Sequence, residues 1–473
     1  MKDKKRRLEL FSIYDHTGIE THLENMAAKG WLLESISPFV WIYRHIEPRK
    51  LHFAVSYYPK ADDYDPEPSE AQKTFHDFCE HSGWILAAGF NKMQIFYNER
   101  ENPIPIETDP VTQVNTIHKA MKKSLLPNFC IPLIFCFMVI RWSHKELMEN
   151  PIDTLLSTVN IVIVFNLVVL AIFYIVEAVG YIIWDRKARM VAKQGEFLPT
   201  PGHRGMKYAA LALITITAIY YIVSVTLHFS GYMIAAAIVI IAVYIYVVDD
   251  IKSNLKSMKV KASTNKVLTT ITSTVIVGFI VPIIIIVNLV AAIVGELAKG
   301  EDYEKKGHTY TESYEYKGVT FTAYHDTLPL TVGDLTGEDD NNYSRMWEEQ
   351  KSLLICQYTA DQDARRDLAQ EMPSLKYTIT KVKIPATYDL CFNQLYNDHD
   401  DKNNKRVPEQ WKRRLEEIDT EPWRAKAAYQ VYIGDEAENT YIICWDGCIV
   451  EMDAGWQLTK QQMGIIAEKL NGI

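Results

Sequence analysis

Polar residues inside long uncharged stretches are the positions of this sequence where chemistry is easiest to recognise. Glu177 and Asn288 are two such residues. A carboxylate in hydrocarbon costs on the order of 3 kcal/mol, so a proton or cation site is one interpretation of Glu177. The other interpretation is that Glu177 lies within two turns of a helix end and reaches water. We favour the second, because no Arg, Lys or other acid accompanies Glu177 in its stretch.

Two acidic runs, at 338–340 and 398–401, could bind a hard cation through carboxylate oxygens. Neither has the spaced ligands and the glycine of a calcium loop, so we interpret both as solvated surface. The sequence contains no phosphate-binding loop, no nucleophile elbow and no C-x-x-C zinc motif. We therefore predict no catalytic residue, no metal and no cofactor, and a protein that is not an enzyme. An extracellular enzyme is an open alternative, because a cleft is not visible in a sequence.

The apolar residues are distributed unevenly along the chain. It has 473 residues, 50 Lys and Arg against 59 Asp and Glu, and 48% hydrophobic residues. At roughly 100 to 200 residues per domain this length requires more than one folded unit. The long uncharged runs fall between Leu125 and Gly295. This concentration excludes a simple globular enzyme, a disordered protein and a repeat solenoid, and it predicts a membrane protein with soluble flanking domains.

Five stretches are long and apolar enough to cross about 30 Å of hydrocarbon as helices. They cover residues 125–142, 155–184, 208–229, 231–248 and 270–295. The loops at 185–207 and 249–269 are rich in Lys and Arg and the alternate loops are not, so the basic loops are expected in the cytoplasm. We predict a multi-pass protein of the cell membrane, with the lipid bilayer as a partner, a cytoplasmic N-terminus and an extracytoplasmic C-terminus.

The N-terminal region contains an internal duplication. In each copy a helix ends at a Gly-Trp pair, Gly30-Trp31 or Gly83-Trp84, and two strands follow. A glycine suits the left-handed residue that ends a helix. Another strand, with alternating apolar residues, lies between the copies at 51–58. This order predicts one antiparallel sheet with helices on one face, an α+β sandwich.

Several motifs of this region are shared with a known family. They are the segment Phe11 to Gly18, the pattern Leu23-x-x-Met26-Ala27-x-Lys29-Gly30-Trp31, the aromatic strand after it, and the second Gly83-Trp84. In these motifs the first quarter of the chain resembles a bacterial membrane-protein family with the domain of unknown function 2812 at the N-terminus. The resemblance implies a membrane block after this domain and a transcriptional regulator as a candidate partner. It implies no catalytic residue, because no activity is established for the family.

The surface of the N-terminal region offers a second kind of candidate site. Residues 1–120 contain 14 Lys and Arg against 18 Asp and Glu. This negative charge argues against contact with a phosphate backbone, so we predict no direct binding of nucleic acid. Exposed aromatic residues such as Trp41 and Tyr57 could bind a protein or a small ligand. We name both as candidate binding residues and expect a cytoplasmic protein partner.

The C-terminal region, 296–473, is acidic, with 21 Lys and Arg against 33 Asp and Glu, and is long enough to bury its own core. We predict an α+β domain with helices at 361–371 and 409–418 and a hairpin at Lys317-Gly318. Strands are expected at 376–384 and 428–433, and Thr459 with Gln462 predicts a capping box that opens a last helix.

A second hairpin is expected at Asp446-Gly447, which lies between β-branched runs. If these two residues form the turn, Trp445 faces Cys448 and Cys444 faces Ile449. The two cysteines then point to opposite faces of the sheet, which disfavours a disulfide between them.

The predicted fold class is therefore a multi-pass membrane block of five helices between an N-terminal α+β sandwich with internal duplication and a C-terminal α+β domain. The domains are 1–115, 120–298 and 299–473. Folded domains on both sides and no catalytic motif favour a membrane-anchored regulatory or sensory protein that couples the envelope to a cytoplasmic protein partner. The alternative is a transporter or permease accessory subunit, motivated by Glu177 and Asn288. Five crossings give no even inverted repeat, so we prefer the first.

Overall fold

The computed structural model describes residues 3–37, 40–62, 64–125, 129–200, 202, 204–225, 230–279, 310–367, 372–402, 404 and 406–472. Within these ranges the side chains of 123–125, 221–225 and 230–242 are not described. The chain forms two compact units. The first comprises Met1–Ile140 and Phe165–Asn288, and the second comprises Arg141–Val164 and Leu289–Ile473.

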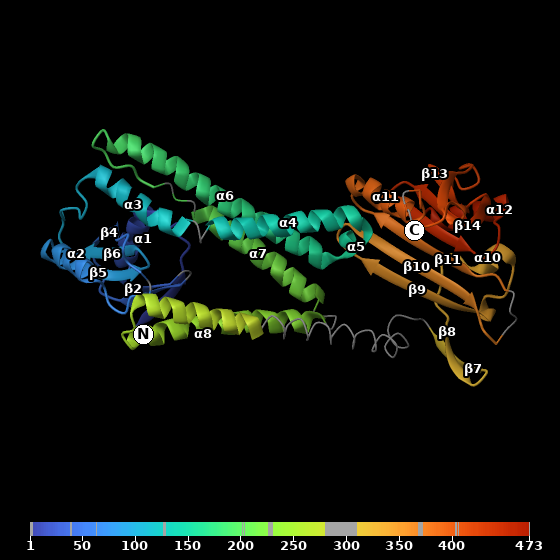
Figure 1. Ribbon diagram of the computed structural model, residues 1–473, viewed down its shortest axis with the longest axis horizontal. Coiled ribbons are helices and arrows are strands. Elements are labelled where there is room, and N and C mark those ends of the chain that lie inside the picture. Colours follow the sequence, from blue (N-terminus) through green and yellow to red (C-terminus); the bar gives the residue numbers. More distant parts are fainter. Residues whose placement is uncertain are drawn as a thin grey trace. The chain divides into compact units, whose positions relative to one another are not determined.

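The first unit begins with two copies of one β-α-β-β motif (Figure 1). The first copy contains β1 (Lys4–Leu8), α1 (His16–Ala27), β2 (Trp31–Ile36) and β3 (Val40–His45). The second copy contains β4 (His52–Tyr57), α2 (Glu70–His81), β5 (Ile85–Phe90) and β6 (Met93–Asn98). Each copy forms its own antiparallel sheet, in the orders β1-β3-β2 and β4-β6-β5. The sequence predicts one sheet, but the structure has two, because the first strand of each copy pairs with the last strand of the same copy.

The two copies correspond closely where the helix turns into the sheet. Gly30 and Gly83 both have positive φ, at +81° and +88°, a conformation that glycine adopts without steric cost. A β-bulge follows at the same distance in each copy, at Glu34 and at Ala87. The connection from helix to sheet therefore has the same backbone conformation in both copies, with a glycine at positive φ and a β-bulge four residues later. We call this connection the Gly-Trp corner.

One apolar core joins the two sheets to α3 (Pro110–Leu125) and to the C-terminal part of α6 (Thr158–Ala192). Its large buried side chains include Tyr14, Ile19, Leu23, Trp41, Tyr43, Tyr57, Ile95, Ile117, Met121 and Trp184. Apolar burial of this kind is the main stabilising contribution to a fold. The end of α6 is thus a structural part of the duplicated module, which residues 1–125 form together with it.

The middle of the chain forms long helices: α4 (Ile131–Glu149), α6, α7 (Arg204–Val225) and α8 (Ser230–Ser257). In the described residues, one helix, α6, is long and apolar enough to cross a membrane by length and composition. The prediction of a five-helix membrane block is therefore wrong. In α4 the charged residues Arg141, Lys145 and Glu146 follow Ile140 within the same helix, so α4 does not meet this measure of composition. Residues 280–295 of the fifth predicted span lie outside the described part of the chain.

The second unit contains a seven-stranded antiparallel sheet. Its order is β12 (Arg413–Glu417), β13 (Ala427–Ile433), β14 (Glu436–Trp445), β15 (Cys448–Ala454), β11 (Leu375–Val382), β10 (Ile355–Ala364) and β9 (Tyr343–Lys351). A separate hairpin is formed by β7 (Thr311–Tyr316) and β8 (Val319–Tyr324), and the short helix α10 (Val332–Thr336) follows it.

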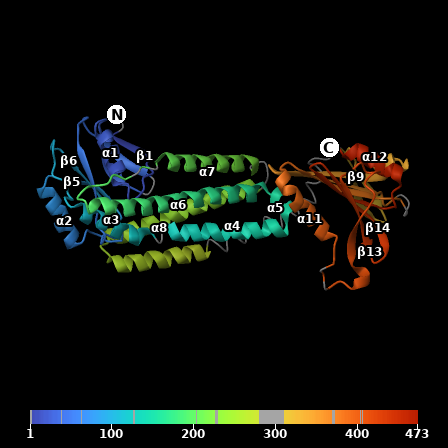
Figure 2. The same cartoon turned by 90° about the horizontal axis from the view of Figure 1, so that it is seen from above.

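Helices cover both faces of this sheet (Figure 2). On one face α10 and α12 (Lys460–Leu470) pack against Ile443, Val450 and Met452. On the other face α11 (Tyr388–Asp398) and α5 (Pro151–Leu156) pack against Ile442 and Ile449. Because neighbouring residues of a strand point to opposite faces, Ile442 and Ile443 define the two cores.

The local predictions for this unit have mixed outcomes. The hairpin at Lys317-Gly318, the pairing of Trp445 with Cys448, and the capping box of Thr459 are confirmed. The helices predicted at 361–371 and 409–418 are wrong, because residues 361–364 belong to β10 and residues 413–417 form β12. Residues 361–364 pair with β9 and β11, and β12 pairs with β13. These strand pairings outweigh the local helix propensity of both segments.

Candidate functional site

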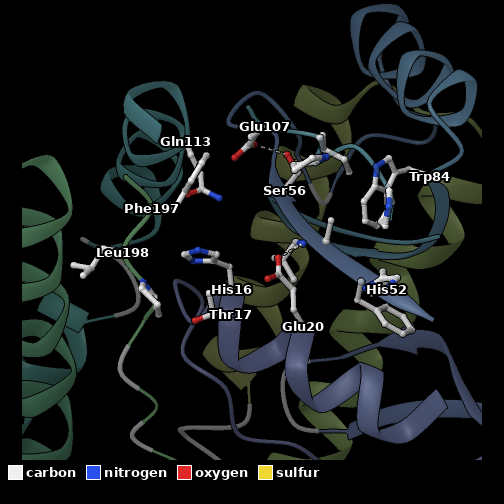
Figure 3. A pocket seen from close by; sticks show the side chains of 17 residues that line it. His16, Thr17, Glu20, His52, Ser56, Trp84, Glu107, Gln113, Phe197 and Leu198 are labelled. Atoms are coloured by element: carbon white, nitrogen blue, oxygen red, sulfur yellow. Dashed lines mark hydrogen bonds between the residues drawn. The ribbon is translucent and has the colours of Figure 1, made fainter. Parts of the chain in front are cut away.

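A cavity of about 420 Å³ lies in the duplicated module of the first unit. Its lining comes from the start of α1, from β4, from the segment 103–107, from α3 and from residues 197–199 between α6 and α7. Figure 3 shows Glu20, Glu107 and Ser56 on one side and Phe197 and Leu198 on the other. The cavity has the size of a small-molecule site.

Glu20 is the first acidic group of this cavity. Its Oε1 accepts a hydrogen bond of 2.8 Å from the backbone N–H of Val55 in β4. Burial raises the pKa of Glu20 to about 8, and the neighbouring acids Glu24, Glu107 and Asp15 contribute in the same direction. At neutral pH this burial therefore favours the protonated form of Glu20.

Glu107 is the second acidic group. Its Oε1 accepts a hydrogen bond of 2.8 Å from the hydroxyl of Ser56, the next residue of β4. Burial raises the pKa of Glu107 as well, against the opposing effect of the Ser56 hydrogen bond. Adjacent residues of one strand thus hold the two carboxyl groups at the wall of the cavity.

His16 borders the same cavity and is 4% exposed. Its Nδ1 lies 3.3 Å from the carbonyl oxygen of Tyr14, which requires the proton on Nδ1. Burial lowers the pKa of His16, although Tyr14 and Asp15 oppose this effect. The imidazole is therefore neutral at pH 7 and adds no positive charge to the site.

The remaining wall is largely apolar. Trp84 is 3% exposed, and its indole N–H donates to the carbonyl oxygen of Ile104 over 2.8 Å, which fixes the ring against the cavity. Phe197 and Leu198 provide apolar surface on the opposite side. The lining residues that the structure describes include no Lys and no Arg. The arrangement can bind a positively charged or proton-donating ligand, and it is unsuited to an anion.

Nothing in the described residues adds a metal centre to this site. No group of three or more His, Cys, Asp or Glu in that part of the chain could hold a metal ion. The two acidic runs predicted as solvated surface, 338–340 and 398–401, belong to the second unit and are not part of the cavity.

Glu177 lies at a second polar site of the first unit. It is 2% exposed and forms a salt bridge with Lys207 of α7. The hydroxyl of Ser12 lies 2.8 Å and 2.9 Å from the two oxygens of Glu177, and Lys207 Nζ donates to the same hydroxyl over 2.9 Å. The expectation that Glu177 reaches water without a partner is therefore wrong. The pairing also removes the lone carboxylate that motivated a transporter subunit.

A further ion pair lies in the segment before α1. Arg204 Nη2 lies 2.7 Å from an oxygen of Glu9, and His22 Nε2 lies 3.0 Å from the other. Burial alone would raise the pKa of Glu9, but His22, Arg7 and Arg204 outweigh it and lower the pKa. The segment from Glu9 to Ser12 is thus attached to the start of α7 by charged contacts.

The aromatic candidates Trp41 and Tyr57 are each 3% exposed and belong to the core. The expectation that they form an exposed binding surface is wrong. Trp41 stacks on Phe11 with ring centroids 5.2 Å apart, and the Tyr57 hydroxyl donates to the carbonyl oxygen of Ile13. The segment before α1, which contains Phe11 and Ile13, covers both rings. The alternation of residues along a strand gives no information about such a covering segment. Asn288 lies outside the described residues.

The sequence did not identify Glu20, Glu107 or His16 as site residues. Glu20 lies beside the apolar stripe of α1, and Glu107 lies in a proline-rich loop with no regular pattern. The one available signal was that four of the five residues 103–107 are uncharged and two of these are prolines, which is unusual for a solvated loop.

The first unit is therefore a duplicated α+β module with an acidic, partly apolar cavity, joined to a long apolar helix. Residues 15–129 match the model of a family described as Protein of unknown function (DUF2812). This match confirms the resemblance for the N-terminal region and covers both Gly-Trp corners and α3. Neither the curated proteins nor the solved structures give a match to the chain.

Proposed function

We propose that this protein is a membrane-anchored regulatory or sensory protein whose duplicated module binds a small ligand and transmits its binding to α6 and α7. One observation carries the proposal: the cavity is lined both by the module, through Glu20 and Glu107, and by residues 197–199, which connect α6 to α7. A ligand in the cavity would contact both parts at once. Its binding would therefore depend on how the connecting segment lies against the module.

Polar contacts link this connecting segment to the helix that carries Glu20. The backbone N–H of Thr200 donates to the hydroxyl of Thr17 over 2.9 Å, and the hydroxyl of Thr200 donates to Asp15 over 2.7 Å. Asp15 also caps the start of α1 through the N–H of Gly18. A shift of α1 on ligand binding would thus also move Thr200, the residue directly after the cavity-lining segment 197–199.

The buried ion pair of Glu177 and Lys207 gives the next step of the connection. It joins α6 to α7 and both helices to Ser12. Buried ion pairs tolerate little displacement, because a separated charge has no water to stabilise it. A change at the cavity is therefore expected to reach α6 and α7 as a movement of packed elements rather than as a local loop change.

Helix α6 is the proposed membrane anchor. It has 35 residues, and 6% of its most apolar window is buried inside the protein. Large side chains such as Ile172 and Ile183 are about half exposed, and a large uncovered apolar surface is typical of contact with lipid. Arg186, Lys187 and Lys193 follow the apolar part of the helix. They favour a cytoplasmic location for this end of α6 and for the module that packs on it.

The partner of the module is proposed to be a cytoplasmic protein, for which a transcriptional regulator is one candidate. The module's excess of acidic residues supports a protein partner over nucleic acid.

The coupling can be tested with a variant that fills the cavity from a tolerant position. Gln113 lies on α3, lines the cavity and is partly exposed, whereas Val111 lies on the same helix outside the lining. We expect Gln113→Phe to slow amide hydrogen exchange in residues 197–200 of the full-length protein in nanodiscs, because the new ring packs on Phe197. Val111→Phe is the matched control. Equal exchange of 197–200 in both variants would overturn the coupling.

A further inference from the structure

We infer that the cavity binds a small organic cation, either a protonated amine or a quaternary ammonium, with an apolar body. The inference rests on the proposed function in one respect, because both treat this cavity as a ligand site. It does not depend on transmission of the signal to α6 and α7.

The charge of the ligand follows from the hydrogen bonds of the two acids. Glu20 and Glu107 each use Oε1 to accept from β4, from Val55 N–H and Ser56 O–H. Neither Oε2 accepts a hydrogen bond from the residues that the structure describes. Two carboxyl oxygens are therefore available to a ligand, while the protein offers them no Lys or Arg from the cavity wall.

The surroundings of the two acids also favour a cation. Asp15 and Glu24 add negative charge near Glu20. The basic groups of the lining are His16, which is buried and neutral, and His52, whose Nδ1 lies 3.6 Å from Glu24. The lining contains no Lys or Arg, so a cationic ligand would supply the missing positive charge and would favour the ionised form of both carboxyl groups.

The apolar body of the ligand follows from the rest of the wall. Trp84, Ile106, Phe197 and Leu198 line the cavity together with Pro103 and Pro105. The indole of Trp84 is held in place by its bond to Ile104, so its face is preorganised. Aromatic faces attract quaternary and protonated amines through the ring quadrupole. A bare metal ion would leave this surface unused, and a hydrophilic amine would lose water there without compensation.

His16 adds an acceptor to the site that a protonated amine can use. It is 4% exposed, its Nδ1 proton is directed to Tyr14, and its Nε2 makes no hydrogen bond among the described residues. A neutral Nε2 is an acceptor. An N–H of a protonated amine can donate to it, whereas a carboxylate or phosphate oxygen cannot.

The experiment is isothermal titration of the full-length protein in nanodiscs with benzyltrimethylammonium, with benzyl alcohol and phenylacetate as the neutral and anionic analogues. The quaternary probe carries a fixed charge, so any proton released comes from the protein. We expect saturable binding of the cation alone, an affinity that rises with pH, and proton release at pH 7 in buffers of different ionisation enthalpy.

Three variants localise this binding. Glu20→Gln and Glu107→Gln are each expected to weaken it at least tenfold, and Glu20→Gln to remove most of the proton release. Glu80→Gln is the matched control, because Glu80 is exposed on α2 of the same module and lies outside the lining. The inference is overturned if benzyl alcohol or phenylacetate binds as tightly as the cation, or if the cation binds the Glu20 and Glu107 variants unchanged.

The outcomes separate this inference from the proposed function. If the cation binds through Glu20 and the exchange of residues 197–200 does not change, the ligand class stands and the proposed coupling fails. If Gln113→Phe slows that exchange and no cation binds, the coupling stands and the ligand class fails.

Discussion

Glu177 of α6 and Lys207 of α7 form a buried salt bridge, with 2% and 7% of the two residues exposed. Ser12, which precedes α1, contacts both through its hydroxyl. Three segments that are distant in sequence therefore meet at one neutralised pair. The pair explains how a carboxylate is accommodated in an apolar helix, and it ties the module to that helix.

Replacing Lys207 by Met keeps a similar side-chain length but leaves Glu177 buried without a cation. We expect Lys207→Met to destabilise the protein by about 3 to 5 kcal/mol, which is the usual cost of breaking a buried pair. The combined variant Glu177→Gln with Lys207→Met is expected to recover most of this loss. Thermal unfolding of the full chain in nanodiscs measures both. Lys187→Met, at an exposed position of α6, is the control, and equal unfolding temperatures for the Lys187 and Lys207 variants would contradict the role of the pair.

Glu20 gives the protein a specific dependence of stability on pH. Its pKa is raised to about 8 in the folded protein, mainly by burial. Between its ordinary value and about 8, the folded state holds a proton that the unfolded state has lost, so stability falls as pH rises through this window. Glu20→Gln removes this contribution, and we expect it to be more stable than the natural protein at pH 8 by on the order of 1 to 4 kcal/mol.

The measurement is the free energy of unfolding at several values between about pH 5 and pH 8, with Glu80→Gln, an exposed acid of α2, as the control. The other charged or titratable groups around Glu20 are Glu107, Asp15, Glu24, His16 and His52, and all of them are retained in Glu20→Gln and in its control. The informative quantity is therefore the difference between the variants. A slope in Glu20→Gln equal to that of the natural protein would show that Glu20 is not the group responsible.

Local signals in the sequence predicted the corners and caps of this fold. Gly30 and Gly83 end their helices with positive φ, and Asp446-Gly447 sets the register of its hairpin. Each of these features depends on a few consecutive residues, so the sequence contains all of the required information. The division of the module into two sheets depends on which strand β1 and β4 choose as a neighbour, and that choice is made by packing.

The candidate site could not be predicted from the sequence either, because it also depends on packing between segments that are distant along the chain. Glu20 lies on α1, Ser56 on β4, and Glu107 in the loop before α3. They come together because α1 and this loop both form hydrogen bonds with β4. Trp41 has the alternation of a half-exposed strand residue, but Phe11 covers it. The apolar runs were recognised correctly as apolar, while their number of membrane crossings was not, because composition does not give the length of the helix that forms.

The two repeat corners allow a matched test of backbone strain. A Cβ on Gly30 would lie 2.9 Å from the carbonyl oxygen of Ile46, which is backbone, whereas a Cβ on Gly83 would lie 3.1 Å from the mobile guanidinium of Arg100. Both alanine variants carry the cost of positive φ, about 1 to 2 kcal/mol. We expect Gly30→Ala to be the more destabilising, because the contact at Ile46 cannot be relieved by a side-chain movement.

Gly205→Ala in α7 is the control, because a Cβ there meets nothing within 4 Å. Thermal unfolding of the full chain ranks the three variants. If Gly83→Ala unfolds at a lower temperature than Gly30→Ala, the contact with the Ile46 carbonyl oxygen does not set the cost of the Gly30 variant.

The membrane assignment of α6 predicts which parts of the chain a protease can reach. With Arg186, Lys187 and Lys193 at the cytoplasmic end of the helix, a protease site inserted at Gly195, after α6, is expected to be cleaved only in inverted vesicles. A site inserted at Asn150, before α6, is expected to be cleaved in intact cells. Changing the three basic residues to Gln removes the charges that orient the helix, so a fraction of the chains is expected to reverse. Matched changes at Lys4 and Lys29, which lie outside α6, control for expression and folding. If both sites are cleaved from the same side of the membrane, α6 does not cross it, and the proposed membrane anchor fails.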